Sequence, residues 1–212
     1  MNSHSVQAQA KLTIGDAAPG IRYSKWLKGT PVNSMNDDKL YVLEFWATWC
    51  GPCIAAMPHL SELSEKYKEQ AVFIGVNVLE KTGEKPYESA LPNVERFVNS
   101  SANRMKYNVI ADNNAQDMYN GWMKAAGIGG IPTTFVVHKQ KIVWIGHPIK
   151  LDSVIPPILD GTYDMAAHKK VYDKDAGAQV KMMKELEEAR ASIKAAVEKK
   201  DFDGAFKLID ES

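Results

Sequence analysis

Two runs of apolar residues, separated by a segment with helical spacing, form the clearest pattern in the chain. Leu40–Trp46 is almost continuously apolar and is broken only by Glu44. Ala71–Leu79 is a second apolar run, and the apolar residues of Ile54–Gln70 between them recur at three- and four-residue intervals. Runs of this length predict strands buried on both faces of a parallel sheet, and the spacing between them predicts an amphipathic helix. The pattern therefore predicts a β-α-β unit.

The downstream half predicts the remainder of a sheet. Lys106–Ala111 reads as a third strand, and Ala115–Ala126 reads as a helix that ends at Gly127 in a left-handed cap. Thr133–His138 and Lys141–Gly146 are separated by two residues, which predicts an antiparallel hairpin. We therefore expect an α/β fold with a central mixed sheet flanked by helices.

Three further segments extend this unit. An N-terminal hairpin is expected around Arg22–Leu27 and Pro31–Met35, where glycine and proline punctuate the chain. Residues 80–104 form an insert after the second core strand, and its second part, Asn93–Ser101, is expected to be a short helix. Leu151–Leu159 begins a last helix that two adjacent prolines make hard to extend.

Composition changes at both ends of the chain and suggests three regions. Residues 1–11 are polar and are expected to be a disordered tail, and residues 12–161 form the α/β domain. Residues 162–212 are expected to be a helical extension, with one helix in Lys174–Lys200 and another from Gly204 to Ile209. Two such helices cannot bury their apolar faces alone. They must pack on the main domain, on a second copy of the chain or on residues beyond Ser212, so a homo-oligomer is one of the alternatives.

Charge and composition exclude several classes of function. Lys plus Arg equals Asp plus Glu, 26 each, so nothing indicates nucleic acid or an anionic membrane as a partner. No apolar run is long enough to cross a bilayer. Either the protein is cytosolic, or a signal peptide or membrane anchor has been removed. Only two cysteines are present, and no pair of histidines completes a zinc site, so we expect no metal.

The two cysteines, Cys50 and Cys53, are three residues apart at the start of the predicted helix. Unpaired N–H groups and the helix dipole at such a position stabilise a thiolate, which is the attacking form in disulfide exchange. We expect Cys50 to be the exposed nucleophile and Cys53 to be the shielded, resolving thiol. A CxxC alone also suits half a zinc site or an inert buried pair. Its place between a buried strand and a helix favours redox chemistry.

The motif and its surroundings resemble a known family. Phe45–Cys53 (FWATWCGPC), with Pro58 five residues further on, resembles the active-site segment of thioredoxins. Gly15–Pro19 (GDAAP), the insert and Ile131–Phe135 (IPTTF) are similar to the TlpA/ResA-type thioredoxin-like proteins of bacterial envelopes. The resemblance covers about residues 12–161. It implies a thioredoxin fold and a thiol–disulfide oxidoreductase.

The resemblance also implies a role for Glu44. It occupies the position at which thioredoxins hold a buried acid beneath the second cysteine. A carboxyl group in an apolar strand should have a raised pKa, because burial penalises its charged form, and it could take the proton from Cys53. The alternative is a partly exposed Glu at a strand end. ResA-type proteins often carry an acidic residue soon after the second cysteine. Residues 54–57 here are uncharged, so that acid–base feature is not carried over.

Further residues are implied to contact the substrate. Ile131 and Pro132 match the family's cis-proline loop, whose backbone can pair with an extended polypeptide; the alternative is an ordinary trans proline that opens an edge strand. Trp49, beside the first cysteine, supplies an apolar contact surface, and Gly51 and Pro52 lie between the two sulfur atoms. No cofactor is expected apart from the redox-active Cys50–Cys53 disulfide.

The sequence thus predicts a protein-disulfide reductase of the bacterial cell envelope. Its partners would be protein thiols or disulfides and an upstream dithiol donor of electrons. The Gly-Pro dipeptide matches reducing thioredoxins, although the direction of electron flow depends on the reduction potential. Two alternatives remain: a thiol peroxidase of the same fold, and a non-catalytic interaction module that uses the helical tail.

Overall fold

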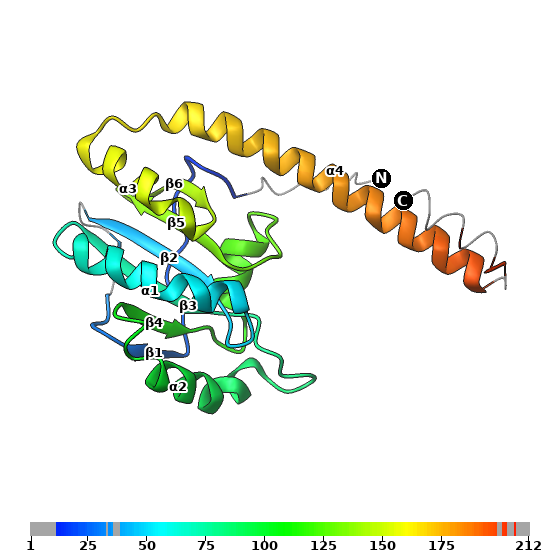
Figure 1. Ribbon diagram of the computed structural model, residues 1–212, viewed down its shortest axis with the longest axis horizontal. Coiled ribbons are helices and arrows are strands. Elements are labelled where there is room, and N and C mark those ends of the chain that lie inside the picture. Colours follow the sequence, from blue (N-terminus) through cyan, green and yellow to red (C-terminus); the bar gives the residue numbers. More distant parts are fainter. Residues whose placement is uncertain (1–11, 33, 36–38, 199–200, 203–205, 207–212) are drawn as a thin grey trace, which may run out of the picture. The chain divides into compact units, whose positions relative to one another are not determined.

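A computed structural model describes residues 12–32, 34–35, 39–198, 201–202 and 206. Its centre is a six-stranded mixed sheet with the strand order β1-β4-β3-β2-β5-β6 (Figure 1). Strands β4, β3 and β2 are parallel to one another, β1 runs antiparallel to β4, and β5 runs antiparallel to both β2 and β6. The strands are β1 Lys25–Lys28, β2 Leu40–Trp46, β3 Ala71–Asn77, β4 Asn108–Ala111, β5 Thr133–His138 and β6 Lys141–Gly146.

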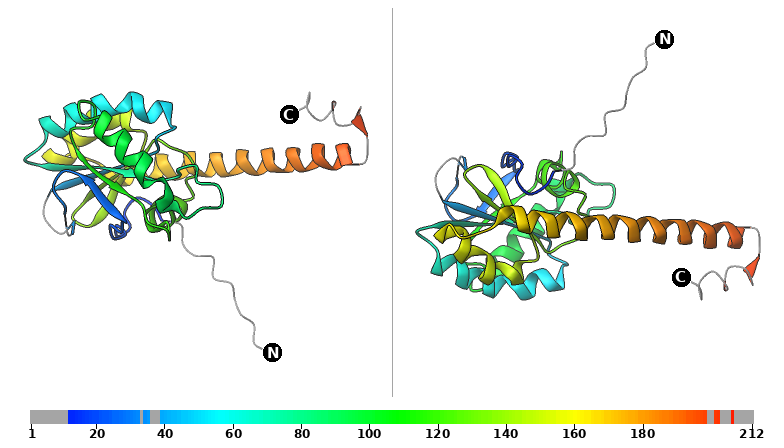
Figure 2. Two further views of the ribbon diagram at one scale, coloured as in Figure 1. Left: turned by 90° about the horizontal axis from the view of Figure 1, so that it is seen from below. Right: turned by 90° about the horizontal axis from the view of Figure 1, so that it is seen from above.

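The helices cover both faces of this sheet. Helices α1, α2 and α3 contribute to one apolar cluster with one face of the sheet, and η2 packs on the other face. Both views in Figure 2 show α1 (cyan) and α3 (yellow) on the same side of the strands. The helical elements are α1 Gly51–Lys66, η1 Tyr87–Ala90, α2 Leu91–Ser100, η2 Tyr119–Lys124, η3 Pro148–Lys150, α3 Leu151–Asp160 and α4 Met165–Glu198.

Strand β2 is the most deeply enclosed element of the sheet. All seven of its residues are buried, because β3 pairs with one of its edges, β5 pairs with the other, and helices cover its faces. Its even-numbered residues face α1, and Phe45 on the opposite face contacts Trp122 of η2 and Phe135 of β5. The predicted β-α-β unit and the predicted hairpin β5–β6 are confirmed. The mixed sheet flanked by helices confirms the predicted fold class.

The predicted N-terminal hairpin is wrong. Strand β1 pairs with β4 instead, with Trp26 opposite Ile110. After β1, Gly29 adopts a positive φ of 82°, and the Thr30 N–H donates to Asn108 Oδ1 at 2.9 Å. These interactions direct the chain along β4, and the described part of Pro31–Met35 contains no strand.

The helix predicted over 115–126 is shorter and has a different hydrogen-bond pattern. Its main part is the π-helix η2, in which the Ala125 N–H donates to the Asn120 carbonyl. Buried Asp112 at the end of β4 accepts hydrogen bonds from the Met118 and Tyr119 N–H groups, which fixes the start of this segment. Gly127 has a φ of 66°, so the predicted left-handed end is confirmed.

The chain divides into two compact units, one up to Met165 and one from Ala166 onward. Helix α4 contains most of the helix predicted over Lys174–Lys200. The predicted tail at 1–11 and most of the second predicted helix, Gly204–Ile209, lie outside the described residues. The region boundaries placed at 11/12 and 161/162 remain predictions. Within the described ranges, none of the helices combines the length and the apolar character needed to span a bilayer.

Candidate active site

The two cysteines lie at the N-terminus of α1, immediately beyond the carboxyl end of β2. Cys50 is the N-cap residue, and its Sγ accepts a hydrogen bond from the Cys53 N–H at 3.2 Å. Pro52 lies in the first turn, where a missing N–H leaves no intrahelical hydrogen bond unmade. Cys50 and Cys53 form a disulfide, with Cα atoms 5.3 Å apart. The unpaired N–H groups of this turn favour a thiolate when the disulfide is reduced.

Cys50 is less accessible than predicted. Only 3% of its surface reaches solvent, so the description of Cys50 as an exposed thiol is wrong for this disulfide-bonded state. The physical reason is that the disulfide joins its sulfur to Cys53, which is fully buried in the first turn of α1. The two residues between them, Gly51 and Pro52, are exposed. Of the two sulfur-bearing residues, Cys50 therefore keeps the only contact with solvent.

Glu44 lies in the middle of β2 and is 1% exposed. Its neighbours across the sheet are Gly75 of β3 and Thr134 of β5, and it shares the α1 face with Trp46. Burial raises the pKa of Glu44 to about 8, because desolvation penalises the carboxylate. The alternative of a partly exposed Glu at a strand end is excluded. The carboxyl group lies in the layer between sheet and α1 that also contains the Cys53 side chain.

The Ile131–Pro132 segment lies at the same edge of the sheet as the cysteines. The peptide bond between these residues is cis, so the trans alternative is excluded. Thr133, the first residue of β5, pairs with Phe45, which is the penultimate residue of β2. The antiparallel register therefore places Pro132 beside the end of β2, where the cysteine segment begins. Ile131 packs against the apolar cluster that includes both cysteines, and it keeps partial exposure.

Trp49 is 46% exposed next to Cys50, as expected for a contact residue. Its indole N–H donates to the Leu79 carbonyl at 2.8 Å, and Lys81 Nζ lies 5.0 Å from the ring centroid. A cation over an exposed indole ring contributes about 0.5–1 kcal/mol. Leu79, just before the insert, and Lys81 within it thus hold the orientation of Trp49.

Glu80, which was not among the residues predicted for the site, anchors the active-site segment. Its carboxylate accepts hydrogen bonds from the Thr48 N–H and the Thr48 hydroxyl, both at 2.7 Å, and from the Asn77 side-chain amide at 2.8 Å. Asn77 in turn accepts a hydrogen bond from the Tyr87 hydroxyl at 2.6 Å. A signal was available, because Glu80 follows strand β3 at the carboxyl edge, where the motif also lies.

The arrangement suits dithiol chemistry more than metal binding. Within the described ranges, no group of three His, Cys, Asp or Glu side chains is placed to hold a metal ion. The site instead combines a disulfide at a helix N-terminus, a buried carboxyl group and a partly exposed proline loop. These are the parts needed to form and resolve a mixed disulfide with a polypeptide.

Comparisons with known proteins agree with this geometry. A model of the AhpC/TSA family matches residues 14–145. Protein FixW of Rhizobium leguminosarum is 27% identical over 205 residues, which cover 95% of this chain and 90% of FixW. The thiol-disulfide oxidoreductase ResA of Geobacillus thermodenitrificans is 35% identical over 99 residues, which are 46% of this chain and 48% of ResA, so the match spans about half of that relative. The predicted resemblance to ResA-type proteins is confirmed.

A solved structure supports the fold. The thioredoxin domain of a thiol-disulfide oxidoreductase from Bacteroides vulgatus superposes with a TM-score of 0.55 at 20% identity, over 69% of this chain and 98% of that domain. At this level of identity the similarity shows the fold alone. The predicted thioredoxin-like fold is therefore confirmed.

The buried carboxyl group predicts a pH dependence of stability. Glu44 is protonated in the folded state below pH 8 but ionises near its ordinary pKa of 4.5 when the chain unfolds. Between these values the unfolded state loses a proton that the folded state keeps, so the free energy of unfolding falls as pH rises, by about 3 kcal/mol at pH 7. Glu44→Gln should remove this loss. In urea unfolding of the oxidised protein, the free energy of unfolding of the variant minus that of the parent should increase by about 3 kcal/mol from pH 4 to pH 7.

Glu62→Gln, which changes an exposed side chain of α1, is the matched control for that measurement. A Glu44→Gln variant whose stability follows the parent's pH dependence would show that Glu44 ionises normally in the folded protein.

The Glu80 anchor predicts a local loss of stability. Glu80→Ala removes the acceptor of three hydrogen bonds from Thr48 and Asn77. We expect the free energy of unfolding to fall by about 2 kcal/mol, and the Thr48 amide hydrogen to exchange faster with solvent. Glu84→Ala, at an exposed position of the same insert, should change stability by less than about 0.5 kcal/mol. Equal effects of the two substitutions would contradict the anchoring role.

Proposed function

Because this chain belongs to the AhpC/TSA family and has relatives named thiol-disulfide oxidoreductases, we propose that it reduces disulfides of protein substrates. The observation that carries the proposal is the Cys50–Cys53 pair at the start of α1, at the sheet edge where the Pro132 loop also lies. The disulfide is the only redox group that the reaction needs, so no further cofactor takes part.

Reduction of a substrate proceeds in two exchanges. The Cys50 thiolate attacks one sulfur of the substrate disulfide, the substrate S–S bond breaks, and its electron pair leaves on the other substrate sulfur. In the fraction of molecules in which Glu44 is ionised, which grows as pH approaches its pKa of about 8, Cys53 then loses its proton to this carboxylate and attacks the Cys50 sulfur. The mixed disulfide breaks, the second substrate sulfur leaves as a thiolate, and Cys50–Cys53 is oxidised. Two electrons have passed to the substrate, and an upstream dithiol returns them.

The groups around the sulfur atoms support a polypeptide substrate. Trp49 gives an exposed apolar surface, and Gly51 and Pro52 leave the approach to Cys50 free of large side chains. Ile131 and Pro132 come directly before Thr133, the first residue of β5, so an extended substrate segment could pair with their backbone as a short added strand. Burial raises the pKa of Glu44 to about 8, a value suited to taking a thiol proton near neutral pH.

The compartment that fits this chemistry is the bacterial cell envelope. Protein disulfides form and persist there, and a reductase acting on them has substrates. The proposal rests on the likeness to ResA-type proteins.

The structure gives less support to a peroxidase. That reaction would need a polar group such as the Thr48 hydroxyl beside the attacking sulfur, and this hydroxyl donates to Glu80 at 2.7 Å. Consumption of hydrogen peroxide by the protein with dithiothreitol alone, and its loss in Cys50→Ser, would favour the peroxidase over the reductase.

The reductase proposal predicts a strong effect of one sulfur atom. Turbidity from insulin reduction by dithiothreitol should rise at least tenfold faster with the protein present, and Cys50→Ser should return it to the uncatalysed rate, because the attacking thiolate is gone. Cys53→Ser should instead accumulate a mixed disulfide with insulin, visible on a non-reducing gel. Equal turbidity rates for the parent and Cys50→Ser would overturn the enzyme proposal and leave the non-catalytic module.

The reduction potential of the Cys50–Cys53 pair tests the direction of electron flow. A value near −270 mV in a glutathione series is expected for a reductase, and one near −120 mV would indicate an oxidase.

A further inference from the structure

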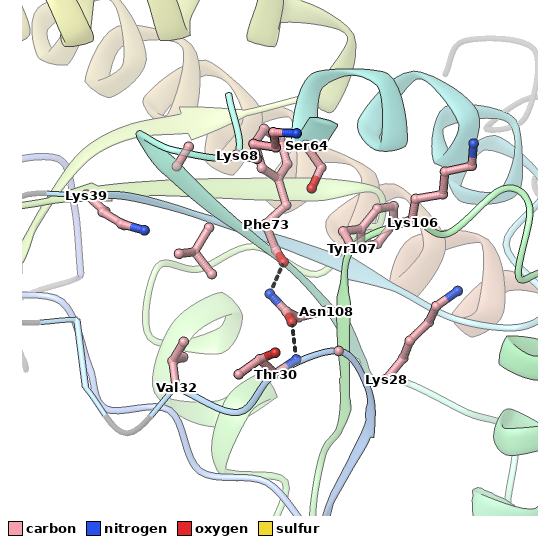
Figure 3. A pocket seen from close by; sticks show the side chains of 13 residues that line it. Lys28, Thr30, Val32, Lys39, Ser64, Lys68, Phe73, Lys106, Tyr107 and Asn108 are labelled. Carbon is pink, nitrogen blue, oxygen red and sulfur yellow. Dashed lines mark hydrogen bonds between the residues drawn. The ribbon is translucent and has the colours of Figure 1, made fainter. Parts of the chain in front are cut away.

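The sheet is incomplete at the amino ends of its parallel strands. Strand β3 pairs with β2 from its first residue, with Ala71 opposite Leu40. Its pairing with β4 begins only at Ile74, opposite Asn108, so Ala71–Phe73 have no partner in β4. An open pocket of about 710 Å³ lies at this gap (Figure 3). Because the cysteines follow the carboxyl end of β2, the pocket lies at the opposite end of the parallel strands.

The Asn108 side chain holds one wall of the pocket in place. Its Nδ2 donates to the Phe73 carbonyl at 3.1 Å, and its Oδ1 accepts a hydrogen bond from the Thr30 N–H at 2.9 Å (Figure 3). These two bonds tie the segment after β1 across the gap to β3. The pocket is therefore formed by the fold itself, as binding sites for small molecules usually are.

Four lysines line the pocket, and they come from four different segments of the chain: Lys28, Lys39, Lys68 and Lys106. Figure 3 shows them spread around the pocket rather than gathered at one point. None of the described residues that line it is acidic, although the chain as a whole has 26 acidic and 26 basic residues. The pocket is thus a local excess of positive charge in a protein of zero net charge, and it attracts anions.

Two of these ammonium groups have contacts that leave them available to an anion. Lys28 Nζ donates to the Ala102 carbonyl at 3.2 Å, which holds the ammonium group in place without neutralising it. Burial lowers the pKa of Lys28, because desolvation penalises its charged form, and an anion beside it would offset that penalty. Lys68 pairs with Glu65 at 2.9 Å, but both side chains are exposed, and such a pair is weak enough for a ligand to replace.

The remainder of the lining indicates the size and character of a ligand. Val32 and Val72 are half-buried and provide apolar surface, and Thr30 and Ser64 provide hydroxyl groups. The volume of about 710 Å³ is typical of sites for small molecules, whereas a stable protein interface needs a wider surface. Lysines spread around such a pocket suit a ligand with separated anionic groups, because each flexible stem lets its ammonium group turn toward the ligand.

We propose that this pocket binds a small organic anion that has an apolar body and two or more phosphate or carboxylate groups, with Lys28 and Lys106 as its principal ionic contacts. These two lysines lie where β1 ends and just before β4 begins, beside the gap in the sheet. The apolar body lies against Val32 and Val72. This site goes beyond the proposed function, since it is remote from the cysteines and takes no part in disulfide exchange.

Titration calorimetry of the whole oxidised chain tests the pocket at low salt, where ionic contacts are least screened. The probes are adenosine triphosphate, trimesate (a benzene ring that carries carboxylates) and inorganic pyrophosphate. We expect adenosine triphosphate, trimesate or both to bind with a Kd below about 1 mM, and pyrophosphate, which has no apolar body, to bind at least about tenfold more weakly. Binding of adenosine triphosphate alone would identify phosphate as the preferred group, and binding of trimesate alone would identify carboxylate.

Paired lysine variants test which charges the ligand meets. Lys28→Gln combined with Lys106→Gln should weaken binding of the tighter probe at least about tenfold. Lys85→Gln combined with Lys150→Gln removes two exposed charges outside the pocket lining and should leave the Kd unchanged. Equal affinities of the two double variants, or binding of neither organic probe, would overturn the proposal. Binding of polyglutamate in place of both organic probes would also overturn it and indicate an acidic polypeptide as the occupant.

Amide shifts of the ¹⁵N-labelled parent provide a readout that needs no variant to fold. The probe should shift the amides of Thr30, Ser64 and Asn108 and leave that of Cys53 in place, whereas shifts that spare the pocket would contradict the assignment. Cys50→Ser should bind the probe with the parent's affinity. A protein that binds the probe at the pocket but fails to reduce insulin would lose the proposed reaction and keep the anion site.

Discussion

The burial of one carboxyl group in the central strand is the constraint around which this site is built. β2 must be apolar on both faces because β3, β5 and helices enclose it. Glu44 breaks that rule at the cost of keeping its proton at neutral pH, since desolvation raises its pKa to about 8. A sequence under selection for stability alone would place an apolar residue here. A buried carboxyl group with a raised pKa at such a position marks a candidate functional group, and the proposed reaction gives it the role of proton acceptor for Cys53.

The register of the sheet brings the parts of the site together. β2 delivers the cysteines at its carboxyl end, and the antiparallel strand β5 begins at the same edge, so the Pro132 loop meets them. β3, parallel to β2, ends there too and leads directly into Glu80, which holds Thr48. Three strand ends thus position the groups, and the short loops that follow them are tied down by hydrogen bonds. The active-site segment is consequently held by the insert as well as by its own helix.

The parts that sequence could predict are those set by local pattern. Long apolar runs located β2 and β3, and the CxxC between strand and helix located the redox centre. The predictions that were wrong concern features that depend on contacts between distant segments of the chain. β1 pairs with β4, more than 80 residues away, because Gly29 and Thr30 redirect the chain. The near-burial of Cys50 follows from its disulfide with Cys53, which the sequence pattern alone does not place.

The first turn of α1 and the sheet face beneath it differ in their acidic groups. The first turn of α1 carries no acidic residue, so nothing there opposes the partial positive charge that stabilises a Cys50 thiolate. An acid in that turn would raise the cost of forming the thiolate. In the proposed reaction the proton of Cys53 is instead taken from the sheet side of α1, where Glu44 is the buried carboxyl group of β2. Glu44 is 1% exposed, so its carboxyl group has almost no direct contact with solvent.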